Sequence, residues 1–118
     1  MTEDMQSVVK SMQQELRRGA IVLCILSLLG KPRYGYALVE RLERSGVPVE
    51  AGTLYPLLRR LEKQGLLRSE WETTGPKPRK YYVMSEDGRE VYRLLCRDWA
   101  DMQTNINDMI QEGESRES

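Results

Sequence analysis

The stretch TLYPLLRRLEKQGLL, residues 53–67, decides the fold. Its leucines recur at steps of three and four residues, so one face of a helix is apolar and must pack on a core. That face holds Leu54, Leu57, Leu58 and Leu61. The opposite face holds Tyr55, Pro56, Arg59 and Lys63. A helix that directs a phenol and two cations to solvent is suited to a polyanionic surface.

A basic hairpin is predicted directly after this helix. Residues 67–72 and 80–84 alternate in polarity, as two strands do. Residues 73–78, TTGPKP, form a turn rich in Gly and Pro. The cations at and beside this turn are Lys77, Arg79 and Lys80. The pattern predicts a recognition helix followed by a two-stranded wing, which indicates DNA binding.

Three further helices are predicted around the recognition helix and the wing. Residues 2–4 supply a cap and two acids ahead of an amphipathic helix that continues to Leu29, with Gly19 interrupting it. A second helix covers residues 34–45 and ends at Gly46. The recognition helix begins between residues 51 and 53, with Pro56 in its opening turns. Ser85 caps a last helix.

The last helix carries an apolar stripe that nothing within so small a chain can cover completely. Its residues are Val91, Leu95, Trp99, Met102, Ile106 and Met109, at steps of three and four. Such a seam is suited to pairing with a partner helix. We therefore expect a homodimer in which the first helix, with Met12 and Leu16, and the last helix form the interface.

One domain is expected from 118 residues. The predicted class is mostly α with a small β-hairpin: a winged helix-turn-helix domain plus a C-terminal dimerisation helix. Residues 1–30 would form the N-terminal helix, 31–84 the winged core, 85–112 the last helix and 113–118 a frayed tail.

The charges are segregated, although 18 Lys and Arg balance 18 Asp and Glu overall. Residues 31–84 hold 11 bases and 6 acids, residues 85–118 hold 4 and 9, and residues 1–30 hold 3 of each. A basic middle and an acidic end are expected when one face meets phosphate and another does not. A random distribution of surface charge is the alternative.

Histidine and cysteine usage excludes several kinds of chemistry. Without His, a Ser/His/Asp or Cys/His catalytic pairing and any His-bearing zinc site are impossible. Cys24 and Cys96 have no CxxC spacing, and buried, reduced thiols are expected. No phosphate-binding glycine loop is present. The sequence thus predicts no enzyme, no cofactor and no metal site.

Membrane insertion and export are not expected. The chain shows no charged leader with a cleavage site, and the apolar run 20–29 is too short to cross a bilayer. We therefore expect a soluble, cytoplasmic protein with no membrane partner.

Three strings together resemble the PadR family of winged helix-turn-helix transcriptional regulators. They are YGYAL at residues 34–38, GTLYPLLRRLEKQGLL at 52–67 and RKYYVMSEDGRE at 79–90, and the match spans 17–92. A single last helix with a tryptophan is similar to the short branch of the family, typified by a multidrug-responsive regulator. The resemblance implies a dimer that binds double-stranded operator DNA and represses transcription. A small molecule would lower its affinity for the operator.

The resemblance also implies roles for individual residues. Those matching the recognition-helix surface that enters the major groove are Thr53, Tyr55, Pro56, Arg59 and Lys63. Arg59 and Thr53 would reach base edges, whereas Tyr55 and Lys63 would hold phosphates. Residues matching other backbone contacts are Tyr34 and Tyr36, before and in the second helix, and Lys77, Arg79 and Lys80 in the wing. The tyrosines could instead be core residues, and the wing a solvated turn.

One position departs from the family pattern. Glu50 stands where serine is frequent, so the recognition helix is expected to lack a good cap and to carry a charge that opposes phosphate.

An effector site is implied at the dimer centre. Positions that match it are Leu16, Ala20, Tyr92, Leu95, Cys96 and Trp99. A small hydrophobic or flat aromatic ligand could stack against paired tryptophans there. Gly19 stands where the multidrug regulator has a polar side chain, so the range of ligands would differ. Alternatively, Trp99 simply fills the dimer core.

Two other classes of function remain open on the sequence. A winged helix can use its basic face for a protein partner instead of DNA. Cys24 and Cys96 could also serve a redox or metal sensor. Salt dependence of binding separates the first alternative from DNA recognition, and replacement of both cysteines tests the second.

Overall fold

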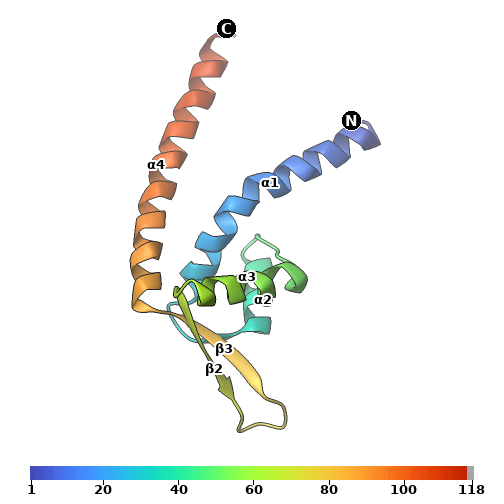
Figure 1. The fold of residues 1–118 in the computed structure, drawn as a ribbon. Coiled ribbons are helices and arrows are strands. Elements are labelled where there is room, and N and C mark those ends of the chain that lie inside the picture. Colours follow the sequence, from blue (N-terminus) through green and yellow to red (C-terminus); the bar gives the residue numbers. More distant parts are fainter. Residues whose placement is uncertain (117–118) are drawn as a thin grey trace.

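Two long helices rise from a small winged core in the computed structural model, which describes residues 1–116 (Figure 1). The molecule measures 64 × 36 × 22 Å. The elements in chain order are α1 (Glu3–Leu28), β1 (Arg33–Tyr34), α2 (Gly35–Arg44), α3 (Ala51–Lys63), β2 (Leu67–Glu72), β3 (Arg79–Met84) and α4 (Glu86–Arg116). The predicted class is confirmed: a mostly helical winged helix-turn-helix with a long C-terminal helix.

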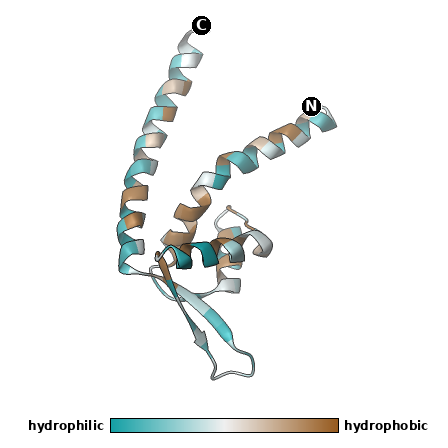
Figure 2. Cartoon of the chain, viewed as in Figure 1, coloured by the Kyte–Doolittle hydropathy of each residue, from teal (hydrophilic) through white to brown (hydrophobic). Residues whose placement is uncertain are grey.

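The core lies where α1, α2, α3 and the sheet meet. The leucine face of α3 is buried as predicted, except that Leu57 is only half-buried. The lower half of α1 and the inner face of α2 complete this core, and Figure 2 shows the apolar residues gathered there. Its fully buried side chains are Ile25, Leu26, Leu29, Leu38, Leu42, Leu54, Leu58 and Leu61.

The predicted helix signals are confirmed at three ends. The Thr2 hydroxyl accepts a hydrogen bond from the Met5 amide at 3.2 Å, and Ser85 accepts one from the Gly88 amide at 2.9 Å. Gly46 follows α2 with a φ of 82°, a backbone conformation that favours glycine. Local capping therefore fixes where these helices begin and end.

The prediction of a two-stranded wing was incomplete, because the sheet has three strands in the order β1-β3-β2. Tyr34 pairs with Tyr81 and Arg33 with Tyr82, so Tyr34 lies in β1 and caps α2 instead of belonging to it. A two-residue strand leaves no alternation for a sequence pattern to reveal. Its pairing with β3 anchors the base of the wing to the core.

The upper parts of α1 and α4 diverge as two arms (Figure 1). Only the first turns of α4 reach the core, through Tyr92 and Leu95. The prediction of a frayed tail from Gly113 was wrong for residues 113–116, because α4 continues to Arg116. One glycine costs an exposed helix about 1 kcal/mol, which does not end a helix whose neighbours favour it. The rest of that predicted tail, residues 117 and 118, lies outside the described residues.

Candidate nucleic-acid interface

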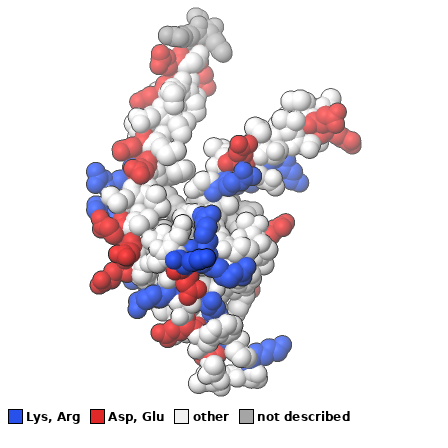
Figure 3. Space-filling model, in the orientation of Figure 1, with Lys and Arg blue, Asp and Glu red and all other residues white. Residues whose placement is uncertain are grey.

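The outward face of α3 presents the side chains predicted to contact DNA. Thr53, Pro56, Arg59 and Lys63 are all exposed. Figure 3 shows Lys and Arg gathered over α3 and the adjoining part of α1, whereas acidic residues predominate along α4, with a few basic residues near its lower end. The expected lack of a side-chain cap is also confirmed, since Glu50 makes no such hydrogen bond at the start of α3.

Tyr55 differs from its predicted position on the solvent-facing side of α3. It is half-buried and packs against the core. Gly35 explains this, because a Cβ there would lie only 2.4 Å from Cε1 of the Tyr55 ring. The missing side chain at the start of α2 lets the ring lie directly on the backbone. Tyr55 therefore ties α3 to α2, and its contact with phosphate stays a prediction.

A cluster of aromatic and charged side chains lies at the base of the wing. The rings of Tyr34 and Tyr36 stack with their centroids 5.8 Å apart, and the Arg79 guanidinium lies 4.4 Å from the centroid of Tyr34. The Tyr34 hydroxyl donates to the carboxylate of Glu72. That hydrogen bond raises the pKa of Tyr34 and lowers the pKa of Glu72. Tyr36 is half-exposed, so its hydroxyl lies at the surface beside this cluster.

The two basic residues of β3 each have an acidic neighbour. Arg79 Nη2 lies 3.8 Å from Glu72 Oε1, its neighbour on β2. Lys80 Nζ lies 3.5 Å from Glu62 Oε1 near the end of α3 and 5.2 Å from the centroid of the Tyr82 ring. Lys77 is exposed in the turn. Of the three wing cations, Lys80 is the one that the structure joins to the end of the recognition helix, through Glu62.

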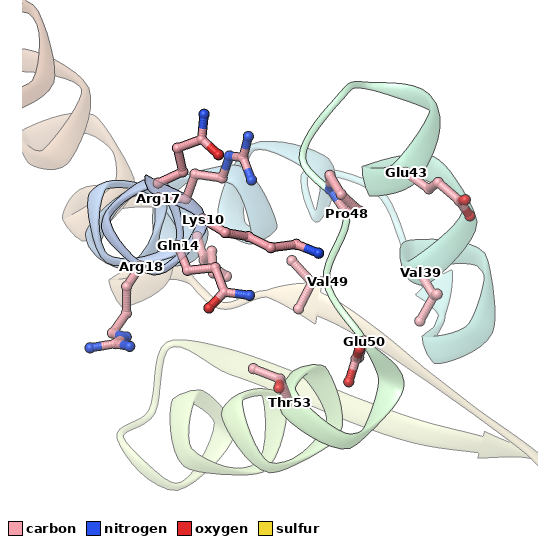
Figure 4. Close-up of a pocket in the computed structure, with 12 residues that line it drawn as sticks. Lys10, Gln14, Arg17, Arg18, Val39, Glu43, Pro48, Val49, Glu50 and Thr53 are labelled. Atoms are coloured by element: carbon pink, nitrogen blue, oxygen red, sulfur yellow. The ribbon is translucent and has the colours of Figure 1, made fainter. Parts of the chain in front are cut away.

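A groove between α1 and the start of α3 was not predicted from the sequence. It has a volume of about 730 Å³ and an apolar floor that includes Ile21 and Val49. Figure 4 shows Lys10 reaching across it from α1, with Thr53 and Glu50 opposite. Arg17 and Arg18 also line the α1 wall. These cations alternate with glutamines on the side of α1 away from its apolar stripe, and only the packing of α1 over α3 places them beside the recognition helix.

Comparison with known proteins identifies this architecture. The model of the Transcriptional regulator PadR-like family matches residues 22–94. The crystal structure of a PadR family transcriptional regulator from Eggerthella lenta is 47% identical and has a TM-score of 0.88, covering 92% of this chain and 97% of that chain. The chain belongs to the PadR-like family of transcriptional regulators. The predicted family and its short form with a single long C-terminal helix are therefore confirmed.

More distant relatives agree with this assignment. A PadR-like transcriptional regulator from Bacillus cereus is 29% identical, with a TM-score of 0.74, and covers 82% of this chain and 97% of that chain. A transcriptional regulator of Mycobacterium tuberculosis is 39% identical over 77 residues, which are 64% of this chain and 72% of the relative. PadR regulators bind DNA and catalyse no reaction, as the sequence predicted for this chain.

The residues predicted for the effector site lie where α1 and α4 leave the PadR core. Trp99 and Leu16 are exposed, by 48% and 81% respectively. Ala20, Tyr92, Leu95 and Cys96 are half-buried. A hydrogen bond with Cys96 raises the pKa of Tyr92. An effector site at these residues stays a prediction.

The two thiols are less buried than predicted. Cys24 and Cys96 are free and half-buried, because the apolar faces of α1 and α4 are only partly covered within one chain. Burial raises the pKa of Cys24. Residues 1–116 contain no cluster of three His, Cys, Asp or Glu side chains that could hold a metal ion. Over the same residues, no helix is both long and apolar enough to span a bilayer.

Proposed function

We propose that this PadR protein is a cytoplasmic homodimer that recognises operator DNA with α3 and makes further contacts to the DNA backbone with the wing. The supporting observation is the exposed cationic face of α3 beside the basic wing (Figure 3). Arg59 and Thr53 would contact base edges from the major groove, and Pro56 would pack there. Residues that would hold phosphates are Tyr34, Tyr36, Tyr55, Lys63, Lys77, Arg79 and Lys80.

The dimer would form through the arms. Large apolar side chains remain exposed along α1, where Met12 and Leu16 are 54% and 81% exposed. The stripe on α4 is also open: Trp99 is 48%, Met102 52%, Ile106 41% and Met109 63% exposed. Val91 and Leu95 continue it toward the core and are half-buried. A soluble protein rarely leaves contiguous stripes of this kind uncovered, so a second copy that buries both arms is the proposed partner.

Repression released by a small hydrophobic or aromatic effector is the finer part of the proposal. Two copies joined along α4 would bring two Trp99 rings together, with Leu16, Ala20, Tyr92, Leu95 and Cys96 around them. Flat rings stack favourably between tryptophans. An effector that changed the angle between the arms would change the spacing of the two α3 helices, which must match successive turns of the duplex.

A salt titration tests DNA binding directly. Fluorescence anisotropy of a labelled duplex, carrying the sequence upstream of the protein's own gene, gives the affinity at several KCl concentrations. The logarithm of the affinity should fall linearly with the logarithm of the salt concentration, with a slope of about −0.9 for each phosphate contacted. A basic face used for a protein partner would leave the duplex unbound even in dilute buffer.

Tryptophan fluorescence tests the effector site. The chain has two tryptophans, and Trp71 lies on the wing, so a Trp71→Phe variant reports on Trp99 alone. A planar aromatic compound that binds between the arms should quench this emission saturably and weaken duplex binding over the same concentration range. If compounds that release the duplex leave the Trp99 emission unchanged, the effector site lies elsewhere.

A further inference from the structure

Three of the proposed DNA contacts are already occupied within the protein. Glu72 accepts the hydroxyl of Tyr34 and lies 3.8 Å from the guanidinium of Arg79. Glu62 lies 3.5 Å from the ammonium group of Lys80. Two carboxylates therefore engage a phenol, a guanidinium and an ammonium group at the base of the wing.

A carboxylate and a phosphate attract the same donors. Arginine, lysine and tyrosine hydrogen-bond to both groups through charged or polar N–H and O–H. The register of the sheet puts Glu72 directly beside Arg79, because the two residues are paired across β2 and β3. Glu62 reaches Lys80 from the last turn of α3 and also accepts the hydroxyl of Ser69. Both acids thus lie within the face that is proposed to meet DNA.

We propose that Glu72 and Glu62 are internal substitutes for DNA phosphate, which hold Tyr34, Arg79 and Lys80 in the free protein and lower its affinity for the duplex. This inference rests on the proposed DNA-binding function. When the duplex binds, the three donors exchange a carboxylate for a phosphate. The affinity is then set by the difference between the two contacts, and the acids limit non-specific binding.

The exposure of these pairs makes the exchange feasible. The side chains of Arg79 and Glu72 are 45% and 34% exposed, and those of Lys80 and Glu62 are 27% and 33% exposed. Ion pairs at such a surface are weak, because water screens them and long side chains lose freedom when they pair. A phosphate in a duplex, surrounded by other phosphates, can therefore displace either carboxylate.

The test compares Glu72→Gln with Glu70→Gln. Glutamine keeps the size of Glu72 and an oxygen that can accept the Tyr34 hydroxyl, but it loses the charge that holds Arg79. Glu70 lies two residues earlier on β2 and accepts the Tyr81 hydroxyl at 2.8 Å. It forms no ion pair within residues 1–116, so Glu70→Gln removes the same charge without releasing a cation. Both variants and the wild type are titrated with a labelled duplex of arbitrary sequence, three helical turns long, at several KCl concentrations.

We expect Glu72→Gln to bind the duplex more tightly than Glu70→Gln by about twofold to fivefold for each wing engaged, the range that corresponds to an exposed ion pair. Its slope against the logarithm of salt concentration should be steeper by up to about 0.9 per wing, because Arg79 would add a full phosphate contact. Glu62→Gln should act in the same direction through Lys80, and it tests the inference independently if Glu72→Gln does not fold.

The opposite result has a clear meaning. If the acids only held the wing in shape, their replacement would loosen it, and Glu72→Gln and Glu62→Gln would bind equally to or more weakly than Glu70→Gln. That outcome overturns the inference and leaves the proposed function intact. If the wild type fails to bind any duplex at low salt, the proposed function fails first.

Discussion

Gly88, in the first turn of α4, should tolerate no side chain, and we expect Gly88→Ala to destabilise the protein. A Cβ there would lie 2.1 Å from the backbone oxygen of Leu66 and 3.0 Å from its carbonyl carbon. That oxygen accepts a hydrogen bond from the Ser85 amide at 3.0 Å, and the Ser85 hydroxyl donates to the Gly65 oxygen at 2.6 Å. These hydrogen bonds hold the start of α4 against the backbone of residues 65–66. Neither segment can therefore move away from a new Cβ without breaking a hydrogen bond.

The expected cost follows from the geometry. The separation of Cβ and oxygen would be more than 1 Å shorter than a close C···O contact of about 3.3 Å. Forcing atoms into a packed site costs about 1–3 kcal/mol, and weakening the Ser85 to Leu66 hydrogen bond adds about 1 kcal/mol. Replacing glycine by alanine in a helix returns about 1 kcal/mol. The free energy of unfolding should therefore fall by about 1–3 kcal/mol, and Tm by about 4 °C for each kcal/mol.

Gly52→Ala is the matched control. Gly52 lies in α3, and a Cβ there would have no neighbour within 4 Å. This variant should be more stable than the wild type by about 0.5–1 kcal/mol, since it gains helix propensity without a clash. Thermal and urea unfolding followed by circular dichroism at one protein concentration measure both variants. A Gly88→Ala protein as stable as the wild type would refute the packing described at this corner.

Three other predictions concern the site and its surroundings. Arg59→Ala should weaken binding to the operator by about fivefold to 150-fold, because a bidentate contact of arginine to a base contributes about 1–3 kcal/mol. Its unfolding should be unchanged, and normal operator binding by anisotropy would place the recognition surface elsewhere. Ile106→Asp should convert the proposed dimer to a monomer in sedimentation velocity, because it puts a charge into the apolar stripe of α4. A dimer that persists in this variant would exclude that stripe as the interface. In a Cys96→Ser variant, alkylation of Cys24 by iodoacetamide should be slow at neutral pH, since a raised pKa leaves less thiolate, and should keep accelerating above the pKa of free cysteine. A rate that levels off near neutral pH would contradict the burial of this thiol.

Local sequence signals were sufficient for most elements. The leucine spacing in α3, the alternation in β2 and β3, and the caps at Thr2 and Ser85 each depend on neighbours a few residues apart. Such signals are expressed within one helix or one hairpin, so they predict the element and its buried face. The solvent-facing cations of the recognition helix follow from the same periodicity.

Contacts between distant residues were not predictable in this way. Strand β1 exists because Tyr34 meets Tyr81, and the hydrogen bond from Tyr34 to Glu72 joins residues 38 positions apart. The half-buried position of Tyr55 depends on Gly35 in another helix. Pairing of Lys80 with Glu62 likewise needs the wing to fold back on the end of α3. Each depends on how the elements pack, which no local period encodes.

DNase footprinting of the DNA upstream of the protein's own gene tests the central proposal most directly. A PadR dimer joined through its arms should protect two related half-sites about one helical turn, or 10 base pairs, apart on one face of the duplex. At a protein concentration that just saturates the site with the wild type, protection should be largely lost with Arg59→Ala. A single unpaired protected site, or none in dilute salt with a folded protein, would contradict recognition by paired α3 helices.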